Sequence, residues 1–162
     1  MLTQANENNT EEDIQFSCFY LGETLCGLDV RLIQEINDDL VTTHVPLSPG
    51  FVVGIMNLRG QIITVIDQSL KIGLGKSTLK EQSRIIIVKF KEQFVGLLVD
   101  SMAEVLTVSK NKISNPPSNL KDIKGRFFYG VVRTNENELI GLLDLQVLLR
   151  DEQNQINKEI IK

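Results

Sequence analysis

The sequence is poor in the residues on which many enzymes and nucleic-acid-binding proteins rely. Its 162 residues include one histidine, two cysteines and no tryptophan, and aromatic residues make up 6%. Nucleic-acid platforms need exposed aromatic side chains in a basic groove, whereas the formal net charge here is −4. No apolar run approaches the roughly 20 residues that span a bilayer. The composition therefore predicts a soluble globular protein that neither binds nucleic acid nor inserts into a membrane, built as one domain or two very small ones.

The negative charge is concentrated at the amino terminus. Residues 1–13 contain four acidic residues and neither lysine nor arginine, so the rest of the chain is formally neutral. A polar, charged segment of this kind is typical of a disordered tail, and it lacks the basic and apolar regions of a secretory signal. A nearly neutral body argues against a partner that is chosen mainly by charge.

The two cysteines, Cys18 and Cys26, are predicted to be buried thiols. If Gly22 and Glu23 form a two-residue hairpin loop, Phe19 lies opposite Cys26. Side chains alternate along a strand, so the two sulfur atoms then lie on opposite faces and form no disulfide. Their spacing also matches no metal-binding motif.

An enzymatic site has little support in the sequence. His44 is the single histidine, and the chain contains no nucleophile elbow and no P-loop, so we expect His44 to be exposed rather than catalytic. A small-barrel enzyme remains as an alternative, because paired carboxylates can perform acid–base chemistry. It would use the four aspartates near strand ends, which N-capping explains equally well, namely Asp29, Asp67, Asp100 and Asp144.

Short apolar runs recur along the chain with turn residues between them, which predicts an all-β fold with short helices. The predicted hairpins pair Ile14–Leu21 with Thr24–Leu28, Phe51–Leu58 with Gln61–Ile66, Arg84–Phe90 with Gln93–Val99, and Phe127–Arg133 with Glu138–Leu143. Three short segments look helical, namely Val30–Glu35, Asp67–Leu70 and Asp144–Leu149, and Asp67 and Asp144 are placed to cap the last two.

The order of these elements occurs twice. The segment around Gly27 matches that around Gly96 at an offset of 69, and Gly54 matches Gly130 at an offset of 76. Glycines at such places suit a bent strand or the close approach of another backbone. We infer two similar β-barrels over residues 14–80 and 81–150, preceded by the disordered acidic tail 1–13 and followed by a C-terminal tail over 151–162.

One strand indicates how the two barrels meet. Residues Ile85–Val88 are apolar without alternation, so this strand must be covered on both faces. One face can line a barrel interior, and the other can pack against a second body. Since a unit of about 70 residues has a marginal core by itself, we expect the two barrels to pack together.

Function should lie where the two halves differ. The first half has an apolar and a basic residue, Leu58 and Arg59, at a hairpin tip, where the second half has the polar turn Arg133–Asn137. An arginine beside apolar surface is a typical interface anchor, although a solvated turn is the simpler interpretation.

A second candidate surface is the segment Leu32–Ile36, with Ser101–Val105 as its counterpart. If Leu32–Ile36 closes a helical turn, Ile33 and Ile36 share one face. A cleft between the two related segments would accept the apolar face of a partner helix, or these residues simply form the core between the barrels.

With these motifs in order, the sequence resembles the chemotaxis coupling proteins of the CheW family over residues 14–150. The resemblance rests on Leu28–Val30 with Ile33–Ile36, on Pro49–Gly60 with the strand Ile62–Asp67, and on Val95–Leu106. The Gly-x-x-Asn-Leu-Arg-Gly element within Gly54–Gly60 is the most specific of them. The resemblance implies two SH3-like five-stranded barrels, no catalysis and no cofactor.

The family resemblance also implies partners. Such proteins are cytoplasmic adaptors of two-component signal transduction, associated with membrane chemoreceptor arrays. They bind the cytoplasmic tip of methyl-accepting chemoreceptors and the regulatory domain of the histidine kinase CheA, and CheW-like domains can alternate with the kinase in rings. A related chemosensory array, such as one for surface motility, is the alternative that the resemblance leaves open.

Carried onto this chain, the resemblance places two sets of site residues. The receptor-binding groove would contain Ile33, Glu35, Ile36, Gly96 and Met102, and the kinase contact would contain Thr42, Arg59 and Ile62. The chain departs from the usual family pattern at Thr64 and at Gln68-Ser69, which we expect to lie near the Arg59 hairpin.

Overall fold

The computed structural model describes residues 13–116 and 125–150. The expected tails fall outside them, except for Asp13, which begins the first strand. The strands are β1 Asp13–Leu21, β2 Thr24–Asp29, β3 Ile33–Asn37, β4 Val52–Leu58, β5 Gln61–Asp67, β6 Arg84–Phe90, β7 Gln93–Val99, β8 Ser101–Ser109, β9 Phe128–Arg133 and β10 Leu139–Leu143. The short helices are η1 Val30–Leu32, α2 Gln68–Lys71, η2 Lys110–Lys112 and η3 Gly125–Phe127, and residues 145–150 are also helical.

The predicted hairpins are confirmed. In the first of them Phe19 lies opposite Cys26 and Cys18 lies opposite Gly27, as the two-residue loop requires. Asp67 caps α2, since its Oδ1 accepts a hydrogen bond from the Leu70 amide at 3.1 Å. Asp144 caps the segment 145–150 through the Val147 amide at 3.2 Å.

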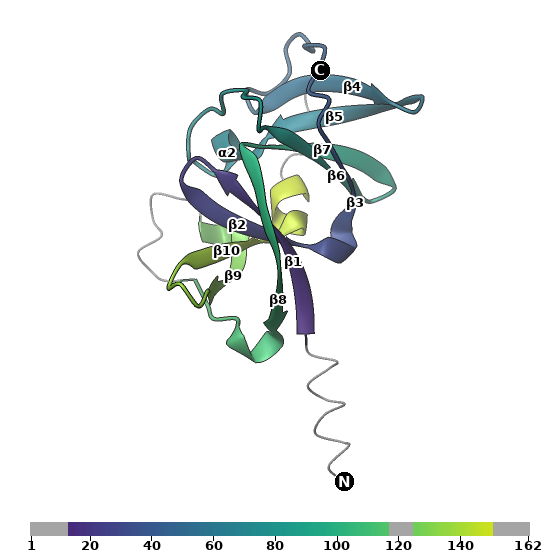
Figure 1. Ribbon diagram of the computed structural model, residues 1–162. Helices are drawn as coiled ribbons and strands as arrows, with labels where there is room; N and C mark the ends of the chain where they lie inside the picture. The colour runs from purple at the N-terminus through teal and green to yellow at the C-terminus, as the bar shows by residue number, and fades with distance from the viewer. Residues whose placement is uncertain (1–12, 117–124, 151–162) are drawn as a thin grey trace.

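The ten strands form two five-stranded sheets, which confirms the all-β fold of two packed five-stranded units (Figure 1). Sheet A has the order β8-β1-β2-β10-β9, and sheet B has the order β3-β6-β7-β5-β4. The repeat makes strands β1–β5 the counterparts of strands β6–β10, in the same order. If every strand is exchanged for its counterpart, the order of sheet A becomes the order of sheet B. The two sheets are therefore related by the internal repeat.

The expected boundary between residues 80 and 81 is wrong. Sheet B uses the continuous stretch β3–β7, whereas sheet A takes β1 and β2 from before it and β8, β9 and β10 from after it. Each repeat thus gives two strands to one sheet and three to the other. The joints between repeats in sheet A are the β1–β8 pair and the parallel β2–β10 pair, and their counterparts in sheet B are β3–β6 and β5–β7.

Two strands carry the chain across between the sheets, and the sequence did not reveal either. The segment expected to be helical over Val30–Glu35 is helical only in η1, and β3 follows directly. Its counterpart Ser101–Val105 begins the nine-residue strand β8. Long-range pairing decides this outcome, because β3 gains its backbone partners from β6 and β8 gains them from β1.

Apolar side chains form three clusters. The largest lies between the sheets, and we call it the shared core; it combines residues of both sheets with Leu145, Leu148 and Leu149 of the helical segment seen between the sheets in Figure 1. Two smaller clusters lie on the faces turned away from the shared core, one on sheet A and one on sheet B, and we call them the interiors of the two sheets. The strand Ile85–Val88 is buried on both faces as expected, with Ile86 and Val88 in the shared core and its other two residues inside sheet B.

The matching glycines lie where other groups approach closely. A Cβ atom on Gly54 would lie 2.5 Å from the Thr43 carbonyl oxygen, because the segment after β3 bonds to β4 through Thr43 and Ile55. Its counterpart Gly130 meets Ile113 and Ser114 in the same way. The repeat is therefore kept even in the loops that cross each sheet.

Burial of the thiols predicts a pH dependence of stability. Burial raises the pKa of Cys18 from its ordinary value of 9.0 to about 11 and that of Cys26 to about 12. Both thiols stay protonated in the folded protein, whereas those of the unfolded chain ionise above about pH 9. The free energy of unfolding should be steady below about pH 9 and should fall as the pH rises toward 11.

Urea denaturation as a function of pH measures this fall, and a Cys26→Ala variant should show a smaller one. Ultraviolet absorbance of thiolate in the folded protein near pH 9 would contradict the expected burial.

Candidate docking surfaces

The turn between β4 and β5 carries an ion pair to β3. The Arg59 guanidinium donates a hydrogen bond from Nη1 to Oε2 of Glu35 at 2.5 Å. Arg59 has a φ of 51° and Gly60 a φ of 84°, and Asn57 Oδ1 accepts the Gly60 amide at 2.9 Å. Positive φ at both central residues is the geometry of a tight hairpin turn. The turn therefore holds Arg59 over the edge strand β3.

A cavity of about 350 Å³ lies beside this ion pair, and we call it cavity B because sheet B contains it. Its lining residues come from β3, from the β4–β5 turn and from β6 and β7, namely Gln34, Glu35, Leu58, Arg59, Gln61, Ile87 and Phe94. Ile36 and Ile62 follow lining residues directly along the chain and are 44% and 64% exposed. An exposed arginine between aliphatic side chains is the composition expected of a protein–protein contact.

The structure does not keep the two predicted site groups apart. Glu35 was assigned to the receptor groove and Arg59 to the kinase contact, yet the two side chains are paired. Thr42 lies in the loop before β4, with its Cβ 3.2 Å from the position that a Gly54 Cβ would take. Thr42 thus packs against the strand that carries the hairpin rather than at its tip.

Two residues of the predicted receptor group lie on the strands that cross between the sheets. Ile33 on β3 and Met102 on β8 are half-buried, and both pack against the shared core. Ile33 lies opposite Val88, and Met102 lies opposite Phe19. These two counterpart residues therefore contact the shared core from the two different sheets.

The shared helical face expected for Ile33 and Ile36 is wrong. Both residues belong to strand β3, in which Ile33 packs on the core while Ile36 is exposed. Strand periodicity turns residues three apart toward opposite faces, so one partner helix cannot cover both of them as helical neighbours.

Gly96 lies inside sheet B rather than on a groove surface. A Cβ at this position would lie 2.8 Å from Ile85 Cγ2 and 3.1 Å from Val65 Cγ2. The glycine lets these two side chains close the interior of sheet B.

The departures from the family pattern do not gather at the Arg59 turn. Gln68 and Ser69 are buried in α2, at the end of β5 opposite to the turn. The Gln68 amide donates to the Leu98 carbonyl at 3.4 Å, and its buried Oε1 has no hydrogen-bond partner among the described residues. Thr64 lies in the middle of β5, paired with Ile55 and Val95.

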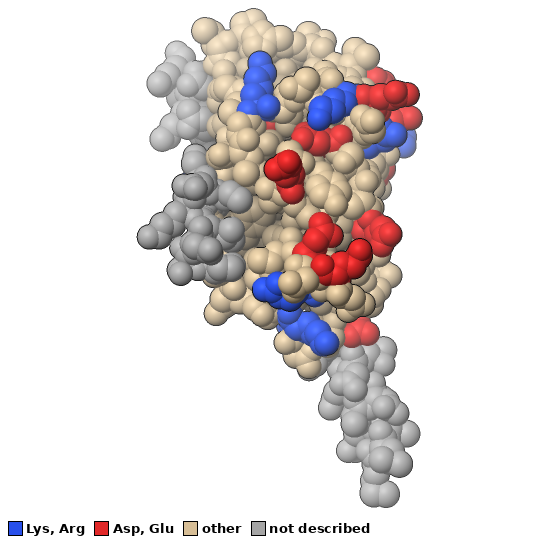
Figure 2. Space-filling view, turned by 60° about the vertical axis from the view of Figure 1, so that its left-hand side comes forward, with Lys and Arg blue, Asp and Glu red and all other residues tan. Residues whose placement is uncertain are grey.

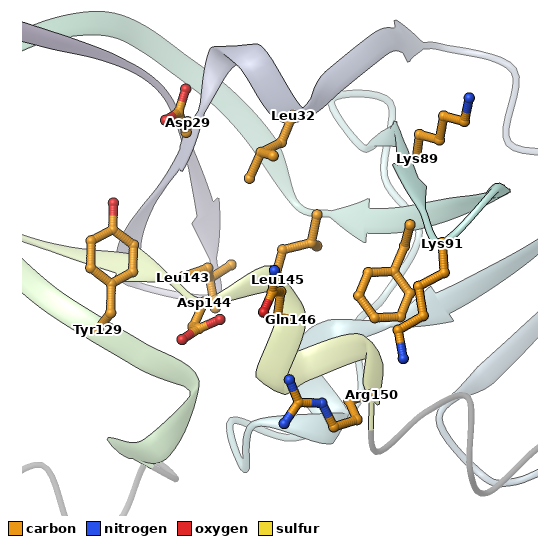
Figure 3. Close-up of a pocket in the computed structure, with 11 residues that line it drawn as sticks. Asp29, Leu32, Lys89, Lys91, Tyr129, Leu143, Asp144, Leu145, Gln146 and Arg150 are labelled. Atoms are coloured by element: carbon orange, nitrogen blue, oxygen red, sulfur yellow. The ribbon is translucent and has the colours of Figure 1, made fainter.

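A third feature, missed in the sequence, is a cavity of about 490 Å³ at the seam between the sheets (Figure 3). Figure 3 shows side chains from β9, from the β6–β7 hairpin and from the segment 145–150 around it; its charged and tyrosine residues are Asp29, Lys89, Lys91, Tyr129, Asp144 and Arg150. No sequence motif connects these residues, because they come from four separate segments of the chain.

Charges in this seam cavity are already partly paired. Asp29 Oδ2 accepts a hydrogen bond from Arg31 Nη2 at 2.6 Å, and this contact holds the pKa of Asp29 below its ordinary value. Burial, with a further contribution from the Asp29 charge, raises the pKa of Tyr129. The tyrosine is therefore a neutral hydrogen-bonding group rather than a general base at neutral pH.

The four aspartates that an enzyme would use all have structural partners. Asp29 pairs with Arg31, Asp67 and Asp144 cap helical segments, and Asp100 Oδ2 accepts the Gly22 amide at 2.6 Å. Within the part of the chain that the structure describes, no cluster of histidine, cysteine and carboxylate side chains suits a metal ion, and no helix is long and apolar enough to cross a membrane. His44 is exposed, as expected.

Charge is evenly spread over the face drawn in Figure 2, where acidic and basic side chains are interspersed on a mostly uncharged surface. This distribution agrees with the formally neutral body that the sequence indicates. On this face no one large patch of a single charge is seen.

Comparisons with known proteins agree on one family. The family described as "CheW-like domain" matches residues 15–153. The chemotaxis protein CheW of Treponema pallidum is 30% identical over 149 residues, with 90% of this chain and 87% of that protein covered. The chemotaxis protein CheW of Thermotoga maritima is 31% identical over 140 residues, with 86% and 90% covered. The crystal structure of the scaffolding protein TtCheW from Thermoanaerobacter tengcongensis aligns with a TM-score of 0.76 and 38% identity, over 83% of this chain and 86% of that one.

The placement of Gly96 inside sheet B predicts the effect of a single methyl group. Gly96→Ala should lower the free energy of unfolding by about 1–3 kcal/mol, because Ile85 and Val65 must move to admit the added carbon. Urea denaturation measures the loss. Gly50→Ala is the matched control, since a Cβ there meets no atom within 4 Å. Equal losses in the two variants would contradict the packing described for Gly96.

Proposed function

Because the chain belongs to the CheW-like domain family, we propose that it couples methyl-accepting chemoreceptors to the histidine kinase CheA through two separate surfaces. The family and its named members establish the coarser function, which is that of a scaffold protein in chemotaxis signal transduction. Adaptors of this family are non-enzymatic, and the structural roles of the four aspartates support the same conclusion for this chain. The proposed location of the protein is the cytoplasmic side of a membrane receptor array.

The kinase surface is proposed at cavity B, and the Glu35–Arg59 ion pair is the observation that carries it. The Arg59 side chain is 75% exposed, so the pair contributes at most about 1 kcal/mol to folding. Stability therefore does not explain why this ion pair is present. Because exposed Ile36 and Ile62 flank it, a role in binding a partner explains it better. Thr42 supports β4 from behind, and Glu35 moves from the receptor group to this surface.

The receptor surface is proposed at the edge of the shared core, where Ile33 and Met102 are half-buried. An amphipathic receptor helix would lay its apolar face on these two residues, which lie on counterpart strands from the two sheets. Gly96 would act indirectly, by keeping the interior of sheet B closed on the face opposite to the shared core. Rings that alternate this adaptor with the kinase, or with further CheW-like domains, would use the kinase surface.

Charge reversal tests the kinase surface. Arg59→Glu should weaken binding of the CheA regulatory domain about tenfold or more, because it places two carboxylates together at the contact. The melting temperature should hardly change, since an exposed pair adds little to stability. Calorimetric titration with the purified domain gives the affinity.

Arg133→Glu is the matched control, because Arg133 lies at the counterpart hairpin and is also exposed. This variant should bind the kinase domain like the unchanged protein. Unchanged binding by Arg59→Glu, or equal losses in the two variants, would overturn the assignment of the kinase surface to cavity B.

The receptor surface is tested by placing a charge at its apolar centre. Met102→Glu should weaken binding of a receptor cytoplasmic-tip fragment about tenfold or more while leaving kinase-domain binding intact, since a helix cannot cover an unpaired carboxylate without cost. Val105→Glu serves as the control, because Val105 lies on the same strand and is 58% exposed. Pull-down with the fragment distinguishes the two variants, and a Met102→Glu protein that still captures it would contradict the proposal.

A further inference from the structure

The seam cavity of about 490 Å³ lies apart from both proposed docking surfaces. Figure 3 shows the helical segment 145–150 below it, η1 above it and the β6–β7 hairpin at its right. Its lining shares no residue with that of cavity B, and neither Ile33 nor Met102 belongs to it. Cavities of this size at the junction of two structural units are common places for the binding of small molecules.

The acidic side chains of the seam cavity already have partners. Both carboxylate oxygens of Asp29 accept hydrogen bonds from the Arg31 guanidinium, at distances of 2.6, 3.1 and 3.2 Å. Asp144 Oδ1 accepts the Val147 amide at 3.2 Å, where it caps the helical segment. Carboxylates held in this way have less to offer a cationic ligand, because their charge is already partly balanced.

The basic side chains of the cavity are not balanced in the same way. The described residues form two ion pairs, and neither of them includes Lys89, Lys91 or Arg150. In Figure 3 the Lys91 side chain extends toward the helical segment that carries Arg150, whereas the Lys89 ammonium points away from it. Lys91 and Arg150 therefore bring two positive charges to the lower part of the cavity, and together they favour an anion there.

An apolar surface lies beside these charges. Phe90 and Leu145 line the cavity and are almost fully buried, and Leu32 lines it and is 41% exposed. The Lys91 ammonium lies 5.4 Å from the centre of the Phe90 ring, so positive charge and apolar surface meet at the same place. A ligand that carries an anionic group on an apolar body would match both.

Tyr129 adds a neutral hydrogen-bonding group to the wall of the cavity. Burial, and then the Asp29 charge, raises the pKa of Tyr129, so its hydroxyl remains protonated and can donate a hydrogen bond. The residue is 45% exposed, and Figure 3 shows it on the side of the cavity opposite to the β6–β7 hairpin. A ligand that lies across the cavity can therefore present an oxygen to this hydroxyl.

We propose that the seam cavity is a binding site for a small organic anion in which a carboxylate or phosphate group is attached to an apolar body. Lys91 and Arg150 would donate hydrogen bonds to the anionic group, the arginine through its fork of donors. The apolar body would lie against Leu32 and Phe90, and Tyr129 would donate to a further oxygen.

This inference goes beyond the proposed function, because it rests on the cavity alone and involves neither the kinase nor the receptor. The bound anion would link the β6–β7 hairpin of sheet B to the helical segment that follows β10 of sheet A. It would therefore stabilise the folded protein in proportion to its concentration.

The test is a titration of the isotope-labelled full chain, followed by nuclear magnetic resonance, with probes that differ in one property at a time. Benzoate and phenyl phosphate carry the two anionic groups, benzyl alcohol has the ring without a charge, and inorganic phosphate has the charge without a ring. Benzoate or phenyl phosphate should shift the amides of Lys91, Tyr129 and Arg150 with Kd at or below about 5 mM, and the tighter of the two identifies the anionic group. Benzyl alcohol and inorganic phosphate should each bind about tenfold more weakly.

Single substitutions locate the probe within the cavity. Lys91→Gln and Arg150→Gln should each weaken binding of the tighter anion about fivefold, since each removes one charge from an exposed position. Tyr129→Phe should weaken it about threefold through the lost hydrogen bond. Lys110→Gln is the matched control, because Lys110 is exposed and lies outside the cavity, and it should leave binding unchanged.

Three results would each overturn the inference. They are the absence of shifts at about 20 mM of either anion, equal binding of benzyl alcohol, and an equal loss of affinity in Lys110→Gln and Lys91→Gln. Shifts gathered at Gln34–Ile36 instead would also overturn it, because they would place the anion at cavity B.

The outcome is independent of the proposed function. The probes contain no kinase or receptor sequence, so their failure to bind would leave kinase binding at cavity B and receptor binding at Met102 unaffected. Conversely, loss of those two activities in their own assays would not remove a shift at Lys91.

Discussion

The shared core between the two sheets is the constraint on which the rest of the structure depends. Each sheet uses one face for its own small interior and the other for this common cluster, so neither sheet is covered unless both are formed. The Ile85–Val88 strand shows this dependence of each sheet on the other most directly, since its side chains alternate between the shared core and the interior of sheet B. Strand exchange ties the two repeats together through backbone pairing within each sheet, in addition to the apolar packing between the sheets.

This arrangement leaves the outer ends of the sheets free for binding. The faces toward the shared core are buried in the folded protein, whereas the edge strands β3 and β8 and the two hairpin turns remain at the surface. Because of the repeat, the two ends are built from the same arrangement of strands. Substitutions at the turns, such as arginine at position 59 and asparagine at position 135, can therefore differentiate them without disturbing the packing that holds the molecule together.

Local patterns in the sequence were enough for the hairpins, the pairing of Phe19 with Cys26, the caps at Asp67 and Asp144 and the two-faced strand, because near neighbours decide all of these. Strands β3 and β8 were missed because their mixed apolar and polar patterns become strands only through partners about 50 and 90 residues away. The same non-local pairing overturned the division at residue 80 and the helical face of Ile33 and Ile36. Arg59 was found as a candidate from its turn, but its pairing with Glu35 depends on how sheet B closes.

The nested order of the strands has a consequence for synthesis of the protein. Sheet B consists of β3–β7, so all of its strands have left the ribosome once residue 99 is free. Sheet A begins with β1, but the β1 edge of the β1–β2 hairpin has no partner until β8 ends at Ser109, and the β2 edge has none until β10 ends at Leu143. The amino-terminal hairpin is made first and completed last, so it is the segment of the nascent chain with the longest exposure to aggregation and to chaperones.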